Sequence, residues 1–91
     1  MIRLNAFAQV GADKKSEYTK LAKELVKQSL HDKGCIAYDL FESGTRGDIV
    51  MICETWEDES SLQAHSISAH FTTLVPEMGK IAPLKIEKFI F

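Results

Sequence analysis

The 91-residue sequence is poor in the residues that mark several classes of small protein. It has only two cysteines, Cys35 and Cys53, too few for the disulfide framework of a secreted domain. Its two prolines and five glycines exclude a collagen-like or low-complexity chain. Because 45% of the residues are hydrophobic and 26% are charged, we expect a single folded domain over residues 1–91.

An excess of basic charge, long apolar runs and targeting signals are also missing. The chain has eleven basic and thirteen acidic residues, so its composition does not favour a nucleic-acid partner. No apolar run approaches the roughly 20 residues of a membrane-spanning helix. Residues 1–5 lack the charged and apolar regions of a secretion signal. We therefore expect a reduced, cytoplasmic protein with no membrane partner.

Motifs for phosphate binding, metal binding and nucleophilic catalysis are absent. The glycines at residues 44–47 lack the P-loop spacing, and the chain has no C-x-x-C or H-E-x-x-H pattern. His65 and His70 are five residues apart, a spacing that does not place two side chains on one face of a helix. They form a poor pair of metal ligands, so we expect neither a metal nor a cofactor.

Hydrophobic patterning predicts the order strand, helix, strand, strand, helix, strand. The strands are expected at residues 2–10, 35–43, 48–56 and 84–91. The helical segments are expected from the N-cap Asp13 to about His31, with Gly34 as C-terminal cap, from the N-cap Asp58 through Ala64, and from about Ser66 to Val75. This order predicts an α+β, ferredoxin-like split βαβ fold with a four-stranded antiparallel sheet.

The second and third strands of the chain form a predicted hairpin, and its register decides which of their side chains share a face of the sheet. If Gly44 pairs with Gly47, Tyr38 lies on the same face as Cys53, and Trp56 lies on the same face as Cys35. The two cysteines are then on opposite faces and cannot form a disulfide.

Both faces of this sheet carry large apolar side chains. One layer of helices covers only one face, so the other face needs a second cover. Another copy of the chain is the simplest cover, and we expect a homodimer with sheet packed on sheet.

The segment 54–71 resembles the antibiotic biosynthesis monooxygenase family, whose members are small dimeric α+β barrels. The family pattern has a Trp at the end of the third strand, an acidic helix start, a His at the end of a short helix and a second His followed by an aromatic residue. The matching residues are Trp56, Asp58, Leu62, His65 and the pair His70-Phe71, with Asn5 matching an Asn of the first strand.

The resemblance implies oxidation of a quinol-like or polycyclic aromatic substrate by dioxygen without metal or flavin. A hydroquinone anion can itself reduce dioxygen, so the protein need only exclude water, remove a proton and stabilise an oxyanion. The catalytic residues are then His65 as base, Asn5 as hydrogen-bond partner of a substrate oxygen and Trp56 as stacking partner. The further substrate-binding residues are Tyr38, Phe71 and His70, which is also the alternative base.

Two other functions remain open for this fold. One is the processing of small signalling metabolites, as in autoinducer breakdown, which for phosphorylated substrates needs cations in the site. The other is a non-catalytic, stress-responsive ligand-binding barrel, in which Trp56 is a core residue and His65 only ties two helices together. Haem degradation is disfavoured because the related branch has a Trp in place of His65 and a His near Val75. Convergence of Asn5, Trp56 and a histidine on one pocket would favour catalysis.

Overall fold

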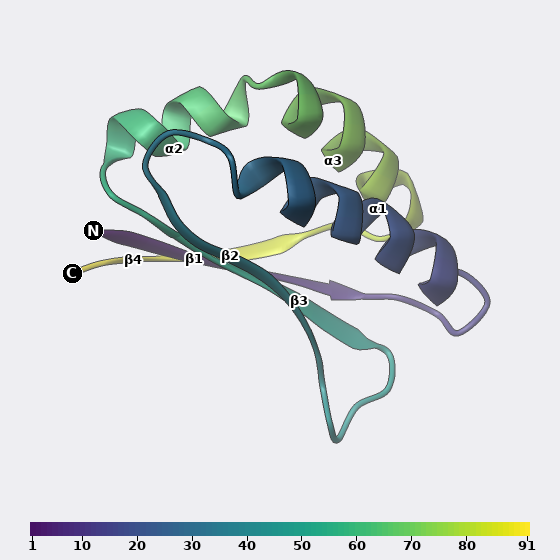
Figure 1. Ribbon diagram of the computed structural model, residues 1–91. Coiled ribbons are helices and arrows are strands. Elements are labelled where there is room, and N and C mark those ends of the chain that lie inside the picture. Colours follow the sequence, from purple (N-terminus) through teal and green to yellow (C-terminus); the bar gives the residue numbers. More distant parts are fainter.

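A computed structural model describes all 91 residues and confirms the ferredoxin-like α+β fold. The elements are β1 (Ile2–Gln9), α1 (Lys15–Ser29), β2 (Cys35–Glu42), β3 (Ile49–Trp56), α2 (Glu59–Ser66), α3 (Ala69–Ile81) and β4 (Lys85–Ile90). The strands form one antiparallel sheet in the order β2-β3-β1-β4. All helices lie on one face of this sheet, and the two termini lie side by side (Figure 1). No helix is both long and apolar enough to cross a membrane.

The side chains of β1 alternate between the two faces of the sheet. Ile2, Ala6 and Ala8 face the helices and are buried, whereas Arg3 is exposed on the other face. Because alternate side chains of a strand point to opposite faces, Asn5 lies on the open face with Arg3.

The start of α1 differs from the prediction. Asp13 does not cap the helix; Lys14 occupies the N-cap position without a side-chain hydrogen bond. The Lys14 N–H donates to the Gly11 carbonyl, so Asp13 lies within a turn before the helix. The helix itself is present as predicted. Side chains along one of its faces, Tyr18, Ala22, Leu25 and Ser29, are buried against the rest of the protein.

Gly34 does not cap α1, because that helix already ends at the C-cap Leu30. Gly34 lies in the loop before β2 with φ of +79°, and its carbonyl accepts the Glu57 N–H at 2.8 Å. The loop is therefore fixed to the start of the segment that leads into α2.

The β2–β3 register is shifted by one residue from the prediction. Tyr38 pairs with Glu54, so Tyr38 faces the helices together with Glu54 and Trp56. A β-bulge between Cys35 and Ala37 restores the original pairing for Cys35, which lies opposite Trp56. Cys35 and Cys53 therefore still lie on opposite faces, and both are free thiols.

The two C-terminal helices begin at side-chain caps. Asp58 Oδ1 accepts the Ser61 N–H at 2.8 Å, as predicted, and Ser68 Oγ accepts the Phe71 N–H at 3.3 Å. The second helix begins later than predicted and continues through Pro76 to Ile81. Proline removes a backbone donor from a helix, but burial of Met78, which is fully inaccessible, offsets this cost.

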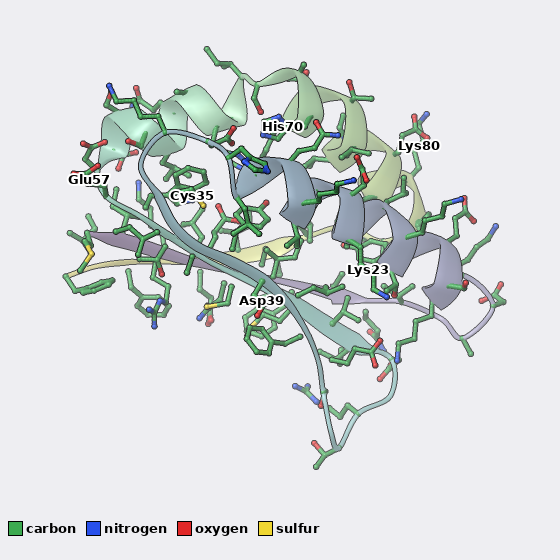
Figure 2. The ribbon with its side chains drawn as sticks, viewed as in Figure 1. Lys23, Cys35, Asp39, Glu57, His70 and Lys80 are labelled. Atoms are coloured by element: carbon green, nitrogen blue, oxygen red, sulfur yellow. The ribbon has the colours of Figure 1, made fainter.

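The face of the sheet opposite the helices has no cover within one chain. Phe41 and Phe89 are 48% and 49% exposed there, and side chains project from this bare side of the sheet in Figure 2. The expected homodimer remains a prediction about this face.

Candidate functional site

A small, partly open cavity lies between the helix-facing side of the sheet and the helices. Its volume is about 220 Å³, below the roughly 300–1,000 Å³ of most ligand pockets. Ten of its thirteen lining residues are hydrophobic. The lining residues are Leu4, Ala6, Leu25, Tyr38, Ile52, Glu54, Leu62, His65, Ser66, Phe71, Val75, Leu84 and Ile86. The cavity therefore suits a small, largely apolar ligand with a polar group at one end.

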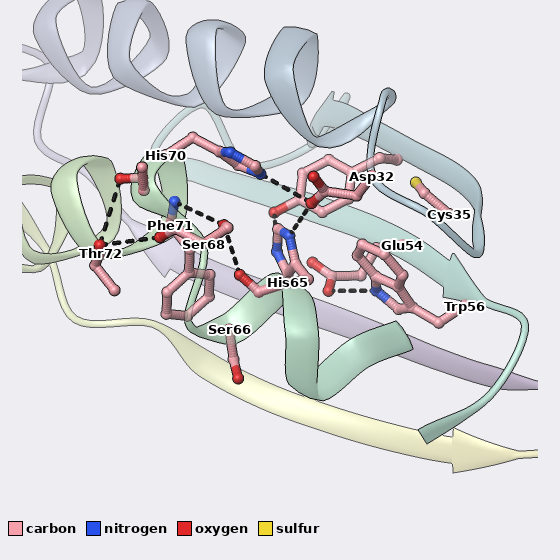
Figure 3. A network of polar contacts seen from close by, with 12 residues as sticks. Asp32, Cys35, Glu54, Trp56, His65, Ser66, Ser68, His70, Phe71 and Thr72 are labelled. Carbon is pink, nitrogen blue, oxygen red and sulfur yellow. Dashed lines mark hydrogen bonds and ion pairs between the residues drawn. The ribbon is translucent and has the colours of Figure 1, made fainter. Parts of the chain in front are cut away.

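His65 lies near the end of α2 and is only 2% exposed. Its Nδ1 lies 2.7 Å from Asp32 Oδ2, and its Nε2 lies 3.5 Å from the Tyr38 hydroxyl (Figure 3). A carboxylate accepts the Nδ1 proton, which leaves the Nε2 lone pair on the side of Tyr38 and the cavity. Burial lowers the pKa of His65, although Asp32 acts in the opposite direction.

Asp32 lies in the turn after α1 and holds both C-terminal histidines. Its Oδ2 accepts a second hydrogen bond from His70 Nε2 at 2.8 Å. His65 ends one helix and His70 begins the next, so the chain reverses between them and their ring centroids are 5.7 Å apart. A five-residue spacing separates two side chains only when both lie on one helix, whereas His65 and His70 lie on different helices.

Glu54 adds a buried carboxyl group to the polar end of the cavity. It is 5% exposed and accepts the Trp56 Nε1–H at 2.9 Å. Burial raises the pKa of Glu54, while hydrogen bonds from Trp56 and Tyr38 oppose this shift. Burial and the neighbouring Glu54 carboxyl also raise the pKa of Tyr38, which keeps its proton. The cavity thus has hydrogen-bonding groups at one end and apolar walls elsewhere.

Trp56 packs against the His65 ring and does not line the cavity. It is fully buried, and its ring centroid lies 4.6 Å from that of His65. The expected stacking of Trp56 on a substrate is therefore not what the geometry provides. Tyr38 and Phe71 do line the cavity, and the Phe71 ring meets the His65 ring edge-on at 5.2 Å.

Asn5 and His70 lie away from the cavity. Asn5 pairs with Cys53 and Glu87 on the open face of the sheet, so it cannot contact a ligand in the cavity of its own chain. His70 reaches Asp32 outside the cavity. The structure therefore brings His65, Tyr38 and Phe71 together around the cavity. Trp56 and His70 do not line it, although Trp56 packs against His65 and His70 shares the Asp32 carboxylate with it. Asn5 lies apart from all of them, on the opposite face of the sheet.

The sequence interpretation missed two site residues, Asp32 and Glu54. Glu54 alternates with Ile52 and Trp56 on the core-facing side of β3, so a buried acid was visible in the strand pattern. Asp32 lies in a turn 33 residues before His65, and no local pattern indicates their contact.

Comparison with known proteins places this site within one family. The sequence profile described as antibiotic biosynthesis monooxygenase matches residues 1–77, which include every lining residue except Leu84 and Ile86. A Bacillus subtilis (strain 168) protein named "Putative monooxygenase YcnE" is 33% identical over 88 residues, covering 94% of this chain and 93% of that protein.

Solved structures share the fold over nearly the whole chain. A Bacteroides thetaiotaomicron protein of unknown function, described as "Possible Oxidoreductase", is 48% identical with a TM-score of 0.96. That comparison covers 99% of this chain and 96% of the other. A conserved Methanosarcina mazei protein is 31% identical with a TM-score of 0.93, covering 97% of this chain and 89% of the other.

Proposed function

Because the chain belongs to the antibiotic biosynthesis monooxygenase family, we propose that it oxidises a small quinol-like aromatic with dioxygen and without a bound cofactor. One observation carries the proposal: His65 borders an apolar cavity while Asp32 holds its Nδ1 at 2.7 Å. This is the arrangement of an oriented general base, in which the carboxylate fixes the tautomer and stabilises the imidazolium that forms.

The proton step follows from the two nitrogens of His65. A substrate hydroxyl at the polar end of the cavity replaces the long contact between Tyr38 and Nε2 and gives its proton to Nε2. Tyr38, which keeps its proton, then donates a hydrogen bond to the substrate oxyanion, and burial raises the pKa of the neighbouring Glu54, which favours the protonated form that can donate a second one. The apolar walls exclude water and strengthen these interactions.

The substrate itself supplies the electrons. Its anion reduces dioxygen, a carbon–oxygen bond forms at the ring, and cleavage of the oxygen–oxygen bond leaves one oxygen atom as a ring carbonyl. The other oxygen atom leaves as water with the two hydrogens lost by the substrate, one of them through His65. No external reductant is needed.

The cavity lining bears on the alternatives. No lysine or arginine lines it, which disfavours a phosphorylated metabolite as ligand. Val75 lies where the haem-degrading branch is expected to place its iron ligand, which disfavours haem. The position of Asn5 on the opposite face favours a ligand-binding protein without catalysis, so this function stays as the second candidate.

Oxygen uptake tests the proposal. The full chain is incubated with hydroquinones and naphthohydroquinones in the presence of a chelator, and the uptake is compared with autoxidation without protein. We expect uptake in proportion to the protein concentration, and we expect His65→Ala to lower the acceleration by about 100-fold or more. Saturable binding of the same compounds without any acceleration would instead support the ligand-binding alternative.

A further inference from the structure

The Asp32–His65–His70 cluster brings three metal-ligating atoms to within 4.8 Å of one another. We propose that this cluster binds a divalent transition-metal ion of the Zn²⁺ class, and that the bound ion prevents His65 from acting as a base. The metal site stands on its own observations, whereas the effect on His65 rests on the proposed function.

The ligand set is the first argument. Two imidazole nitrogens and one carboxylate oxygen suit Zn²⁺ and related divalent ions, and three protein ligands leave a position for water. His65 and His70 direct their nitrogens at the same Asp32 oxygen, from 2.7 and 2.8 Å (Figure 3). The three side chains therefore already converge on one point.

A bound ion replaces the two hydrogen bonds. It needs a wider spacing between the Asp32 oxygen and each histidine nitrogen than the present 2.7 and 2.8 Å. Zinc–nitrogen bonds of roughly 2.0–2.1 Å in a tetrahedral site place the ligand atoms about 3.3 Å apart. Asp32 lies in a turn outside the helices and strands, and its side chain is 19% exposed. Rotation of this side chain moves its oxygen away from the two nitrogens. Small rotations of the His65 and His70 rings adjust the distance between those nitrogens, which lie within 4.8 Å of each other, to the same value.

Charge and access also favour a cation. The Asp32 carboxylate has no lysine or arginine partner; its only ion-pair contacts are the two histidines. The His70 side chain is 12% exposed, whereas that of His65 is 1% exposed. An ion therefore reaches the cluster from the solvent side, through His70 and Asp32, without passing through the cavity.

The ion acts on the opposite nitrogen from the one that faces the cavity. Coordination by Nδ1 moves the single proton of the neutral imidazole to Nε2. His65 then presents an N–H to Tyr38 and cannot accept a substrate proton. The ion itself does not touch a ligand in the cavity, because the His65 ring lies between them.

Metal titration tests the site without a known substrate. The chelator-treated full chain is titrated with Zn²⁺ by calorimetry and with Co²⁺ by visible absorption. We expect one ion per chain and a loss of roughly tenfold or more in affinity for His70→Ala and Asp32→Asn. His31→Ala is the matched control, because His31 is exposed and outside the cluster, and it should bind like the wild type. Absence of binding, or equal affinity in all variants, would overturn the site.

Two further measurements remove the effect of misfolding and separate the two proposals. His70→Gln keeps a hydrogen-bond donor for Asp32, so it should melt like the wild type and still lose affinity. In imidazole nitrogen NMR spectra of the wild type, Zn²⁺ should shift the signals of His65 and His70 but not those of His31. Where oxygen uptake is found, Zn²⁺ should inhibit the wild type; binding without inhibition would overturn the effect on His65 alone. Failure of every substrate would leave the metal result unchanged.

Discussion

The His65 ring separates two chemical environments. Its Nδ1 meets a partly exposed carboxylate, and its Nε2 meets a buried hydroxyl beside an apolar cavity. A single side chain therefore connects the proposed reaction with the proposed metal site, and substitutions at this position are the most informative ones.

We predict that His65→Ala lowers turnover by about 100-fold or more, the usual contribution of a general base. The loss of the buried contact with Asp32 should also lower the melting temperature, but the remaining protein should stay folded. Oxygen uptake and a thermal melt on the same preparation separate the two effects, with His31→Ala as the control. A folded variant with normal turnover would exclude His65 from the mechanism.

The buried carboxyl group of Glu54 should make the stability of the protein depend on pH, and its burial decides the sign of that dependence. Burial raises the pKa of Glu54 above its ordinary value of 4.5, so the folded state binds this proton more tightly than the unfolded state. The contribution of Glu54 to stability should therefore be fully present below the unfolded pKa and should be lost as the pH rises through the folded pKa.

Glu54→Gln should remove this dependence while it keeps an acceptor for the Trp56 N–H. Urea unfolding from about pH 4.5 to pH 8 measures the free energy of unfolding of both proteins. As the pH rises over this range, the free energy of unfolding of the variant should increase relative to that of the wild type. The increase should be about 1.4 kcal/mol for each unit by which folding raises the pKa of Glu54. A difference between the two that does not vary with pH would contradict the prediction.

Sequence reasoning identified the residues with local signals and missed the contacts between distant ones. His65 and Trp56 stood out because they are rare side chains in a recognisable spacing. The pairing of Asp32 with both histidines depends on how three helix ends meet, which no spacing in the sequence encodes. The register of Tyr38 was mispredicted because the sequence does not show where the hairpin turn begins the pairing, nor that a β-bulge near Cys35 interrupts it.

At the scale of the elements, the loop between α1 and β2 depends on Gly34. Its φ of +79° is unfavourable for other residues, and a Cβ at this position would clash with the Ser61 side chain at the start of α2. The loop also carries Asp32, so its conformation positions the carboxylate for His65.

We predict that Gly34→Ala destabilises the fold by about 1–2 kcal/mol for the backbone conformation alone, and by more because of the clash. In a domain of this size, each kcal/mol corresponds to roughly 4–8 °C in melting temperature. Gly44→Ala is the matched control, because no atom lies within 4 Å of the added Cβ and its φ is not positive. Equal melting temperatures for the two variants would show that the loop can rearrange.

The order and type of the elements were predictable, whereas their ends were less so. Alternation in β1 and the stripe in α1 come from burial, which the sequence records directly. The end of α3 was misplaced because Pro76 is a strong local stop signal that the burial of Met78 overrides. The prediction of Asp13 as N-cap was wrong because the turn before α1 ends at Lys14, which occupies the N-cap position.

At the scale of the whole molecule, the open face of the sheet decides the state of assembly. The chain buries only 17 of its 91 residues, and Phe41 and Phe89 are half exposed on the face without helices. Burial of this surface against a second copy would give the chain a second core.

We predict that the protein is a dimer in analytical ultracentrifugation and that Phe41→Lys shifts it to a monomer. The charged side chain would have to enter an apolar interface without a partner. Ile67→Lys is the matched control, because Ile67 is 80% exposed in the connection between α2 and α3, on the helix side of the sheet. A Phe41→Lys protein that still sediments as a dimer would locate the interface elsewhere.

The neighbouring ends of the chain have a consequence for its topology. Met1 and Phe91 are joined by two hydrogen bonds, from the Met1 amino group to the Phe91 carbonyl at 2.6 Å and from the Phe91 N–H to the Met1 carbonyl at 2.9 Å. A linker of a few residues can therefore connect them, and new ends can be opened in the exposed turn at residues 44–47. Such a circular permutant would keep every strand pairing while placing two hydrogen-bonded neighbours, the edge strand β2 and the central strand β3, at opposite ends of the chain.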